Sequence, residues 1–288
     1  MQDPEIRVLD VPRAGTGESP VWDDRTGLLW WVDIPGPTLH RTDPATAATR
    51  SWPLPEPVGS LALCRDDSLI LALRSGLHRF RPETGELTLI AAPEPDRPMN
   101  RLNDGKASPE GRFVVGSMDD RPEKEATAGL HVLHQNGTVT RLLDGLVISN
   151  GLAWGPDGRT LWHSDSRGSC IWLQNWDRRT GTIADRRLVA TPTEAQGRPD
   201  GAATDTEGGY WSAGVSAGVL NRWLPDGTLD RVVRLPVQWP TMPCFGGPDR
   251  RTCFVTSLRK SEGAGPDDGA VLALDLGVAG TPVGRYAG

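Results

Sequence analysis

A short turn recurs six times along the chain, and each copy separates two apolar runs. The turns lie at residues 23–27, 65–68, 108–111, 155–158, 205–208 and 248–251. The last residues of neighbouring turns are 41 to 50 residues apart. A repeat of this length is typical of β-propellers, in which every repeat forms one blade of the ring.

The run that follows each turn is rich in aromatic and β-branched residues and is bounded by Gly, Pro or Asp, as strands usually are. These runs are residues 28–32, 69–73, 113–116, 161–163, 210–213 and 253–257. A third strand and a hairpin turn, such as Asn136-Gly137, complete the pattern. We therefore predict an all-β fold, a six-bladed β-propeller with four-stranded antiparallel blades. Residues 6–9 are expected to supply the outer strand of the last blade and remove an open edge.

Composition agrees with one continuous ring. Six similar units in 288 residues, without a linker, predict a single β-propeller domain over residues 1–288. Because no apolar run approaches about 20 residues, we expect no membrane span. The four cysteines form no C-x-x-C pair and are expected to be reduced, which favours a cytoplasmic protein. A net charge of −6 provides no positive potential that would attract nucleic acid. No obligate protein partner is evident from the sequence.

Four polar residues recur at nearly the same phase of the repeat: Glu18, Asn103, Asn150 and Asp200. The first strand of each blade lines the central channel, so equivalent positions on successive blades converge at one mouth of it. A simpler interpretation is that Asn-Gly and Asp-Gly pairs form turns. However, Asn150 and Asp200 come just before innermost strands expected at 152–154 and 202–204. The phasing therefore predicts one shared site.

Two carboxylates and amide oxygens in a narrow channel would repel one another unless a cation lay between them. Ligation by oxygen alone favours one divalent metal ion of the hard type: calcium, magnesium or manganese. Zinc and iron(II) stay open, although neither His nor Cys occupies a phased position. The five histidines lie in or beside expected strands and are interpreted as structural.

Several motifs, taken in order from about residue 15 to the C-terminal strand, resemble the gluconolactonase and regucalcin family of sugar lactone lactonases. They are residues 17–22 (GESPVW), 101–106 (RLNDGK), 149–154 (SNGLAW), 199–201 (PDG) and 243–247 (PCFGG). The resemblance implies one divalent metal held by Glu18, Asn150 and Asp200. It also implies that Arg101 and Asn103 face the bound sugar, with Asn103 close to the metal.

Two segments differ from the family's usual pattern or vary within it. The usual Gly-Glu-Gly-Pro stretch here has Ser19 in place of the second glycine, which keeps a small residue beside the ligand Glu18. Residues 117–120 and the following 121–127 resemble the family's variable substrate-covering loop. Asp120 is assigned to substrate binding together with Arg101 and Asn103.

The function expected from these residues is metal-dependent hydrolysis of a small-molecule sugar lactone, an aldonolactone, to the aldonic acid. The metal would polarise the lactone carbonyl, and Asp200 would act both as ligand and as general base toward water. Arg101 presents a planar fork of donors to the substrate, unless it forms a surface ion pair with Asp96 or Asp104. Two alternatives remain: a metal-dependent esterase or organophosphate hydrolase, and a calcium-binding propeller without catalysis.

Overall fold

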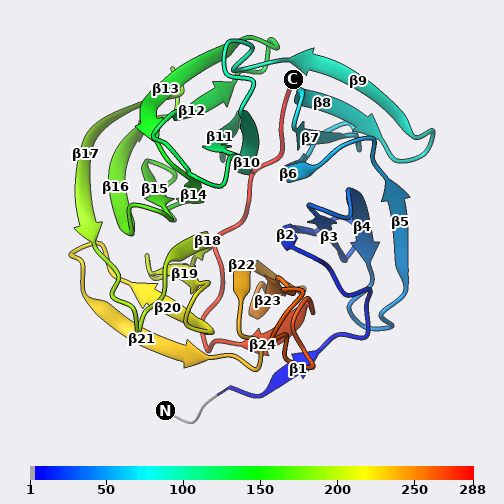
Figure 1. Cartoon of the computed structure of the whole chain (residues 1–288), viewed down its shortest axis with the longest axis vertical. Coiled ribbons are helices and arrows are strands. Elements are labelled where there is room, and N and C mark those ends of the chain that lie inside the picture. Colours follow the sequence, from blue (N-terminus) through cyan, green and yellow to red (C-terminus); the bar gives the residue numbers. More distant parts are fainter. Residues whose placement is uncertain (1–3) are drawn as a thin grey trace.

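In the computed structural model, which describes residues 4–288, the protein consists of six four-stranded antiparallel sheets. The sheets are arranged as blades around a central channel (Figure 1). The predicted six-bladed β-propeller is thereby confirmed. No helix long and apolar enough to cross a bilayer occurs among these residues.

In the first three blades, four consecutive strands follow one another from the channel outward. Blade one contains β2 (Gly17–Asp23), β3 (Leu28–Asp33), β4 (Thr38–Thr42) and β5 (Thr49–Pro53). Blade two contains β6 (Val58–Leu63), β7 (Leu69–Leu73), β8 (Gly76–Arg81) and β9 (Glu86–Ala91). Blade three contains β10 (Asn100–Ala107), β11 (Phe113–Asp119), β12 (Ala128–Leu133) and β13 (Val139–Leu146).

Blades four and five repeat this order, whereas blade six combines both ends of the described chain. Blade four contains β14 (Ser149–Trp154), β15 (Thr160–Asp165), β16 (Cys170–Asp177) and β17 (Thr182–Ala190). Blade five contains β18 (Pro199–Thr204), β19 (Tyr210–Gly214), β20 (Val219–Trp223) and β21 (Leu229–Arg234). Blade six contains β22 (Pro240–Gly246), β23 (Thr252–Ser257), β24 (Leu272–Asp275) and β1 (Ile6–Val8).

Strand β1 is the outermost strand of blade six. Ile6 pairs with Leu274 and Val8 with Leu272, in antiparallel register. The amide of Leu9 extends the contact by donating to the Val271 carbonyl at 2.9 Å. The expected closure by the N-terminal segment is confirmed, and it covers the edge of β24 that would otherwise be unpaired.

Large aromatic side chains fill the space between neighbouring blades. Trp31, Trp162 and Trp211 are fully buried in their sheets. Trp162 of blade four stacks on Tyr210 of blade five, with ring centroids 4.6 Å apart. Such pairs contribute about 0.5–1.5 kcal/mol beyond their burial, so they hold adjacent sheets at fixed angles.

The end of the chain crosses the channel instead of forming another strand (Figure 1). We call residues 276–288 the C-terminal strap. Its Thr281 amide donates to the Thr204 carbonyl of blade five at 2.9 Å, and its Tyr286 amide donates to the Leu63 carbonyl of blade two at 2.8 Å. Arg285 pairs with Asp23 and Asp24 of blade one. These partners lie at or just after the last residues of the inner strands β2, β6 and β18. The strap therefore closes the end of the channel at which the inner strands finish.

Every inner strand is irregular at one point, where its register with the second strand shifts. The shifts fall between Glu18 and Val21, Val58 and Ser60, Leu102 and Gly105, Asn150 and Ala153, Pro199 and Ala202, and Pro240 and Met242. These bulges coincide with the phased positions. A bulge bends its strand and re-aims the side chains beside it, which is why bulges are common next to functional sites.

The strand bounds correct one expectation. The inner strands were expected at 152–154 and 202–204, but β14 begins at Ser149 and β18 at Pro199, so Asn150 and Asp200 lie inside these strands and not before them. Gly151 follows Asn150 with a φ of +66°, and an added Cβ would come within 2.2 Å of the Tyr210 hydroxyl oxygen. The glycine is thus required by backbone conformation and by close packing of blade five, and not by a turn.

Candidate active site

A cavity of about 270 Å³ opens at the end of the channel opposite the C-terminal strap. It lies where the inner strands begin. Its lining includes every residue at the four phased positions, Glu18, Asn103, Asn150 and Asp200, together with Arg101. The inner strands of blades one, three, four and five therefore bring the predicted residues into one place.

Asparagine side chains link three blades across the floor of this cavity. Asn103 Nδ2 donates to Asn150 Oδ1 at 3.1 Å and to the Ser149 carbonyl at 3.0 Å. Asn150 Nδ2 donates in turn to Asp200 Oδ1 and to Ser166 Oγ, each at 2.7 Å. Asn103 thus orients Asn150, and Asn150 orients Asp200.

Glu18 completes the floor from blade one. Its Oε2 accepts the backbone amide of Ser19 at 2.9 Å. Ser19 has a φ of +47°, in the left-handed region that favours glycine. The serine hydroxyl offsets part of that cost because its oxygen accepts the Leu61 amide of blade two at 2.9 Å. Ser19 therefore leaves the position of Glu18 intact.

Burial shapes the electrostatics of the two carboxylates. Desolvation, followed by the charges of Asp200 and Asp104, raises the pKa of Glu18 well above its usual range. Burial and the Asp104 charge raise the pKa of Asp200 to about 8, although the Arg198 and Arg101 guanidinium groups oppose the shift. Both groups therefore favour the neutral form until an added positive charge stabilises their charged forms.

These residues fit a divalent cation. Glu18 and Asp200 each accept a hydrogen bond at one carboxylate oxygen, which leaves the other for a further partner. Asn150 Oδ1 accepts only one hydrogen bond and retains a second lone pair. Residues 4–288 contain no metal-binding cluster of three or more His, Cys, Asp or Glu side chains, so the set depends on the Asn150 amide. Two carboxylates and an amide are oxygen ligands of the kind that hard cations prefer.

Arg101 and Asp120 lie at the edge of the cavity as an ion pair. Arg101 Nε donates to Asp120 Oδ1 at 3.3 Å, and its Nη1 donates to Asn103 Oδ1 at 2.8 Å. Asp120 also accepts from Arg74 of blade two at 2.5 Å. The alternative pairs of Arg101 with Asp96 or Asp104 do not form. Asp120 itself does not line the cavity and contacts Arg101 and Arg74 at its edge.

Sequence reasoning missed two charged residues in the channel below the site. Asp104 is buried; its Oδ2 accepts the Leu152 amide at 2.9 Å, and its Oδ1 has no hydrogen-bond partner. Lys106 is also buried, and its ammonium donates to the Ala202 carbonyl. The two residues are two apart in one strand, a spacing that places side chains on the same face and was available from the sequence.

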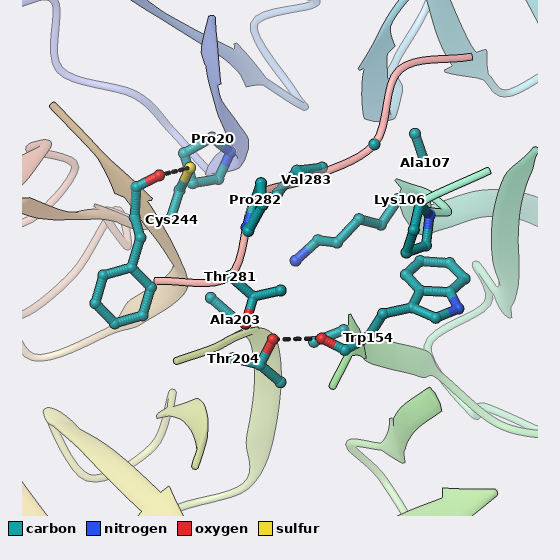
Figure 2. A pocket seen from close by; sticks show the side chains of 14 residues that line it. Pro20, Lys106, Ala107, Trp154, Ala203, Thr204, Cys244, Thr281, Pro282 and Val283 are labelled. Atoms are coloured by element: carbon teal, nitrogen blue, oxygen red, sulfur yellow. Dashed lines mark hydrogen bonds between the residues drawn. The ribbon is translucent and has the colours of Figure 1, made fainter. Parts of the chain in front are cut away.

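Lys106 separates the candidate site from the C-terminal strap. It lines a small pocket of about 20 Å³. Figure 2 shows its side chain projecting into this pocket, near Pro282 and Val283 of the strap and near Trp154. Lys106 and the strap therefore lie together in the channel behind the cavity.

Sequence reasoning also missed three basic residues of the cavity wall, Lys124, Arg167 and Arg198. Lys124 lies in the segment 121–127 that resembles the substrate-covering loop, whose individual contacts were not assigned. Arg167 and Arg198 lie in other connections between strands and belong to no motif, so only the fold brings the three together. The histidines, in contrast, are structural as expected: His163, for example, is buried and shares a hydrogen bond of 2.8 Å with Ser149 Oγ. The four cysteines are free thiols, as predicted.

Fold and site together define a propeller protein with an oxygen-rich polar centre at one mouth of its channel. The sequence profile of the SMP-30/Gluconolactonase/LRE-like region matches residues 16–259. The chain belongs to this family. The resemblance noted in the sequence is confirmed, and with it the expectation of a gluconolactonase-like enzyme.

Relatives extend over nearly the whole chain. It is 35% identical to regucalcin from Xenopus laevis, over 94% of this chain and 95% of that protein. It is equally 35% identical to 6-deoxy-6-sulfogluconolactonase from Pseudomonas putida, with 94% and 95% coverage. L-arabinolactonase from Azospirillum brasilense is also 35% identical, with 99% and 96% coverage.

A solved structure of regucalcin from Agrobacterium tumefaciens, described as a calcium-binding protein, superposes with a TM-score of 0.90. It is 29% identical and covers 99% of this chain and 97% of its own. Both the ring and its strand order are therefore shared with a family member.

Proposed function

We propose that this protein is a sugar lactonase that holds one divalent cation with Glu18, Asn150 and Asp200 and hydrolyses an aldonolactone to its aldonic acid. One observation carries the proposal: two buried carboxylates with raised pKa values lie beside an amide on the floor of an open cavity. Relatives named as lactonases of sulfogluconolactone and arabinolactone support the substrate class.

A bound cation would supply Lewis acidity to the lactone carbonyl and would offset the charges of the two carboxylates. Calcium is the first candidate because the similar regucalcin structure is described as calcium-binding. Manganese, magnesium, zinc and iron(II) are the others to be tested.

Asp200 acts as the general base. Its Oδ1 accepts from Asn150 Nδ2 and keeps a second lone pair that would serve the cation, which leaves Oδ2 to accept a proton from the attacking water. The water oxygen bonds to the carbonyl carbon, the ring C–O bond breaks, and the released ring oxygen takes up a proton to become a hydroxyl. A positioned base of this kind contributes about 10² to 10⁴ in rate.

Arg101 and Asn103 bind and orient the sugar. Arg101 is held on one side by Asp120 and on the other by Asn103 Oδ1, so its planar fork is fixed before substrate arrives. The remaining N–H groups of the guanidinium can donate to sugar hydroxyls or to the ring oxygen. Asn103 acts mainly by holding Asn150 and Arg101 in register.

The test measures the hydrolysis rate of a panel of aldonolactones. The rate is measured first after a chelator has removed bound metal and then after each of the five cations has been added back. We expect chelation to abolish turnover and at least one cation to restore it. Asp200→Asn should lower kcat by about 10² to 10⁴. Asp157→Asn, in an exposed turn at the other end of blade four, is the matched control. Full turnover and full cation affinity in Asp200→Asn would show that the base is another group.

A second candidate, calcium binding without catalysis, has one observation in its favour: the same floor residues would serve a binding protein, and a similar structure is described in those terms. Calcium affinity without turnover of any lactone would favour it. Including an aryl ester and an aryl phosphotriester in the panel separates the esterase or organophosphate hydrolase alternative. A cytoplasmic location and the absence of nucleic-acid and obligate protein partners stay predictions.

A further inference from the structure

The cavity wall carries more positive than negative charge, in a protein whose overall charge is negative. The lining includes Arg101, Lys124, Arg167 and Arg198 but only two acidic residues, Glu18 and Asp200. The chain as a whole has 31 basic and 37 acidic residues. The local excess of cations therefore does not follow from composition.

The positive charges lie on one side of the mouth. Lys124 is in the connection after β11 of blade three, Arg167 follows β15 of blade four, and Arg198 precedes β18 of blade five. We call these three residues the cationic arc. Across the cavity, blades one and six provide the uncharged Thr16, Ile34 and Leu258 besides Glu18.

Among the described residues, the three side chains of the cationic arc form no ion pair. Within residues 4–288, Arg101 is the one basic residue of the lining with a carboxylate within 4 Å, namely Asp120. Lys124 donates to the carbonyls of Asp119 at 2.7 Å and Arg121 at 3.2 Å, which leaves its third N–H. Burial lowers the pKa of Lys124; the charges of Asp120 and Asp119 oppose the shift, and those of Arg101 and Arg167 add to it, so the two guanidinium groups are close enough to repel the ammonium.

A bound divalent cation would increase this excess. It would neutralise the charges of the Glu18 and Asp200 carboxylates. No uncompensated negative charge among the lining residues would then face the cationic arc across the cavity. Like charges gathered around a partly enclosed cavity are costly unless an anion enters between them.

We propose that the substrate is an anionic sugar lactone, whose carboxylate, phosphate or sulfonate group, remote from the lactone carbonyl, is bound by Lys124, Arg167 and Arg198. This inference rests on the proposed lactonase function and names its substrate class. The lactone carbonyl faces the floor residues, and the acidic substituent faces blades three to five. Guanidinium groups suit such anions because they donate two parallel hydrogen bonds.

The first experiment compares kcat/KM for glucono-1,5-lactone with kcat/KM for its 6-phosphate and for a lactone of glucaric acid. We expect the wild-type protein to favour the anionic lactones at least about tenfold, with the preference decreasing as salt is added. Arg167→Gln and Arg198→Gln should each reduce the ratio of anionic to neutral kcat/KM about three- to tenfold. Arg159→Gln, exposed at the opposite end of blade four, is the control and should leave the ratio unchanged.

A second measurement does not depend on turnover. 1,5-Anhydroglucitol and its 6-phosphate keep the sugar ring but lack the carbonyl, so calorimetry gives their affinities directly. Titration in the presence of chelator excludes binding of the phosphate to a cation. We expect the phosphorylated ligand to bind at least about tenfold more tightly, and this difference to decrease in Arg167→Gln and Arg198→Gln.

The outcomes separate this inference from the proposed function. Turnover of the neutral lactone without preference for the anionic ones overturns the inference and leaves the lactonase standing. A preference that persists in both arginine variants also overturns it, because another group would then hold the anion. If no lactone is turned over, the lactonase proposal fails; tighter binding of the 6-phosphate would still support the anion site, and equal affinities would overturn it.

Discussion

Tyr286 anchors the C-terminal strap, and its replacement should destabilise the whole ring. The side chain is 1% exposed and packs in a cluster with Ile70, Leu77, Phe113 and Leu133 of blades two and three. Its hydroxyl donates to the His134 carbonyl at 2.8 Å. Its backbone carbonyl accepts the Arg65 amide at 3.0 Å.

The expected magnitude follows from these contacts. Removing a buried aromatic ring to alanine usually costs about 3–5 kcal/mol, so Tyr286→Ala should lower the free energy of unfolding by that amount. For a protein of this size, such a change lowers Tm by roughly 5 to 8 °C. Tyr286→Phe keeps the ring and removes only the hydrogen bond to His134, so it should cost about 1 kcal/mol.

Urea unfolding followed by tryptophan fluorescence measures both variants against the wild type. We expect the midpoints to fall in the order wild type, Tyr286→Phe, Tyr286→Ala, with an unchanged m value. A loss below about 1 kcal/mol for Tyr286→Ala would refute the reasoning, because it would mean that the strap adds little to the stability of the ring.

Three further predictions concern other parts of the structure. Deleting residues 1–10 removes the pairing of β1 with β24 and should lower Tm; an unchanged Tm in a thermal scan would contradict the closure role. Arg101→Ala should raise KM for sugar lactones while cation affinity measured by calorimetry stays the same, and loss of cation binding instead would mean that Arg101 is structural. Burial lowers the pKa of His163 to about 3, whereas in the unfolded chain the pKa of a histidine is about 6.5. As the pH drops below about 6.5, the unfolded state therefore binds a proton that the folded state does not, and the free energy of unfolding falls. Replacing His163 with Gln should therefore reduce the loss of unfolding free energy between pH 8 and pH 5 by about 2 kcal/mol, and an equal loss in both proteins would contradict this assignment.

The sequence was sufficient to predict the ring because the repeat encodes it in every blade. Turn residues at a steady spacing and aromatic or β-branched runs between them define the strands locally. The phasing of Glu18, Asn103, Asn150 and Asp200 was sufficient to predict that they meet, because each inner strand starts at an equivalent place. These predictions needed no knowledge of contacts between blades.

The bulges and the edge of the site depend on such contacts and were not predictable. Gly59, for example, lies so close to blade three that an added Cβ would be 2.5 Å from the Leu102 carbonyl oxygen. The placement of Asn150 and Asp200 just before the inner strands, and not inside them, failed for the same reason. Asp120 meets Arg101 because β10 and β11 pair within blade three, and it meets Arg74 only because blades two and three are neighbours. Arg167 and Arg198 lie in loops, where no periodic pattern marks their direction.

The pairing of residues 6–8 with residues 272–275 has a consequence for how the protein is made. Residues 6–8 are synthesised long before residues 272–275 and have no partner until those residues follow. Contacts between such distant parts of a chain slow folding, since a large loop has to be closed first. Until the two strands pair, each keeps a bare edge to which the equivalent segment of another copy could add, so molecules in which this contact has not yet formed are the most exposed to mispairing.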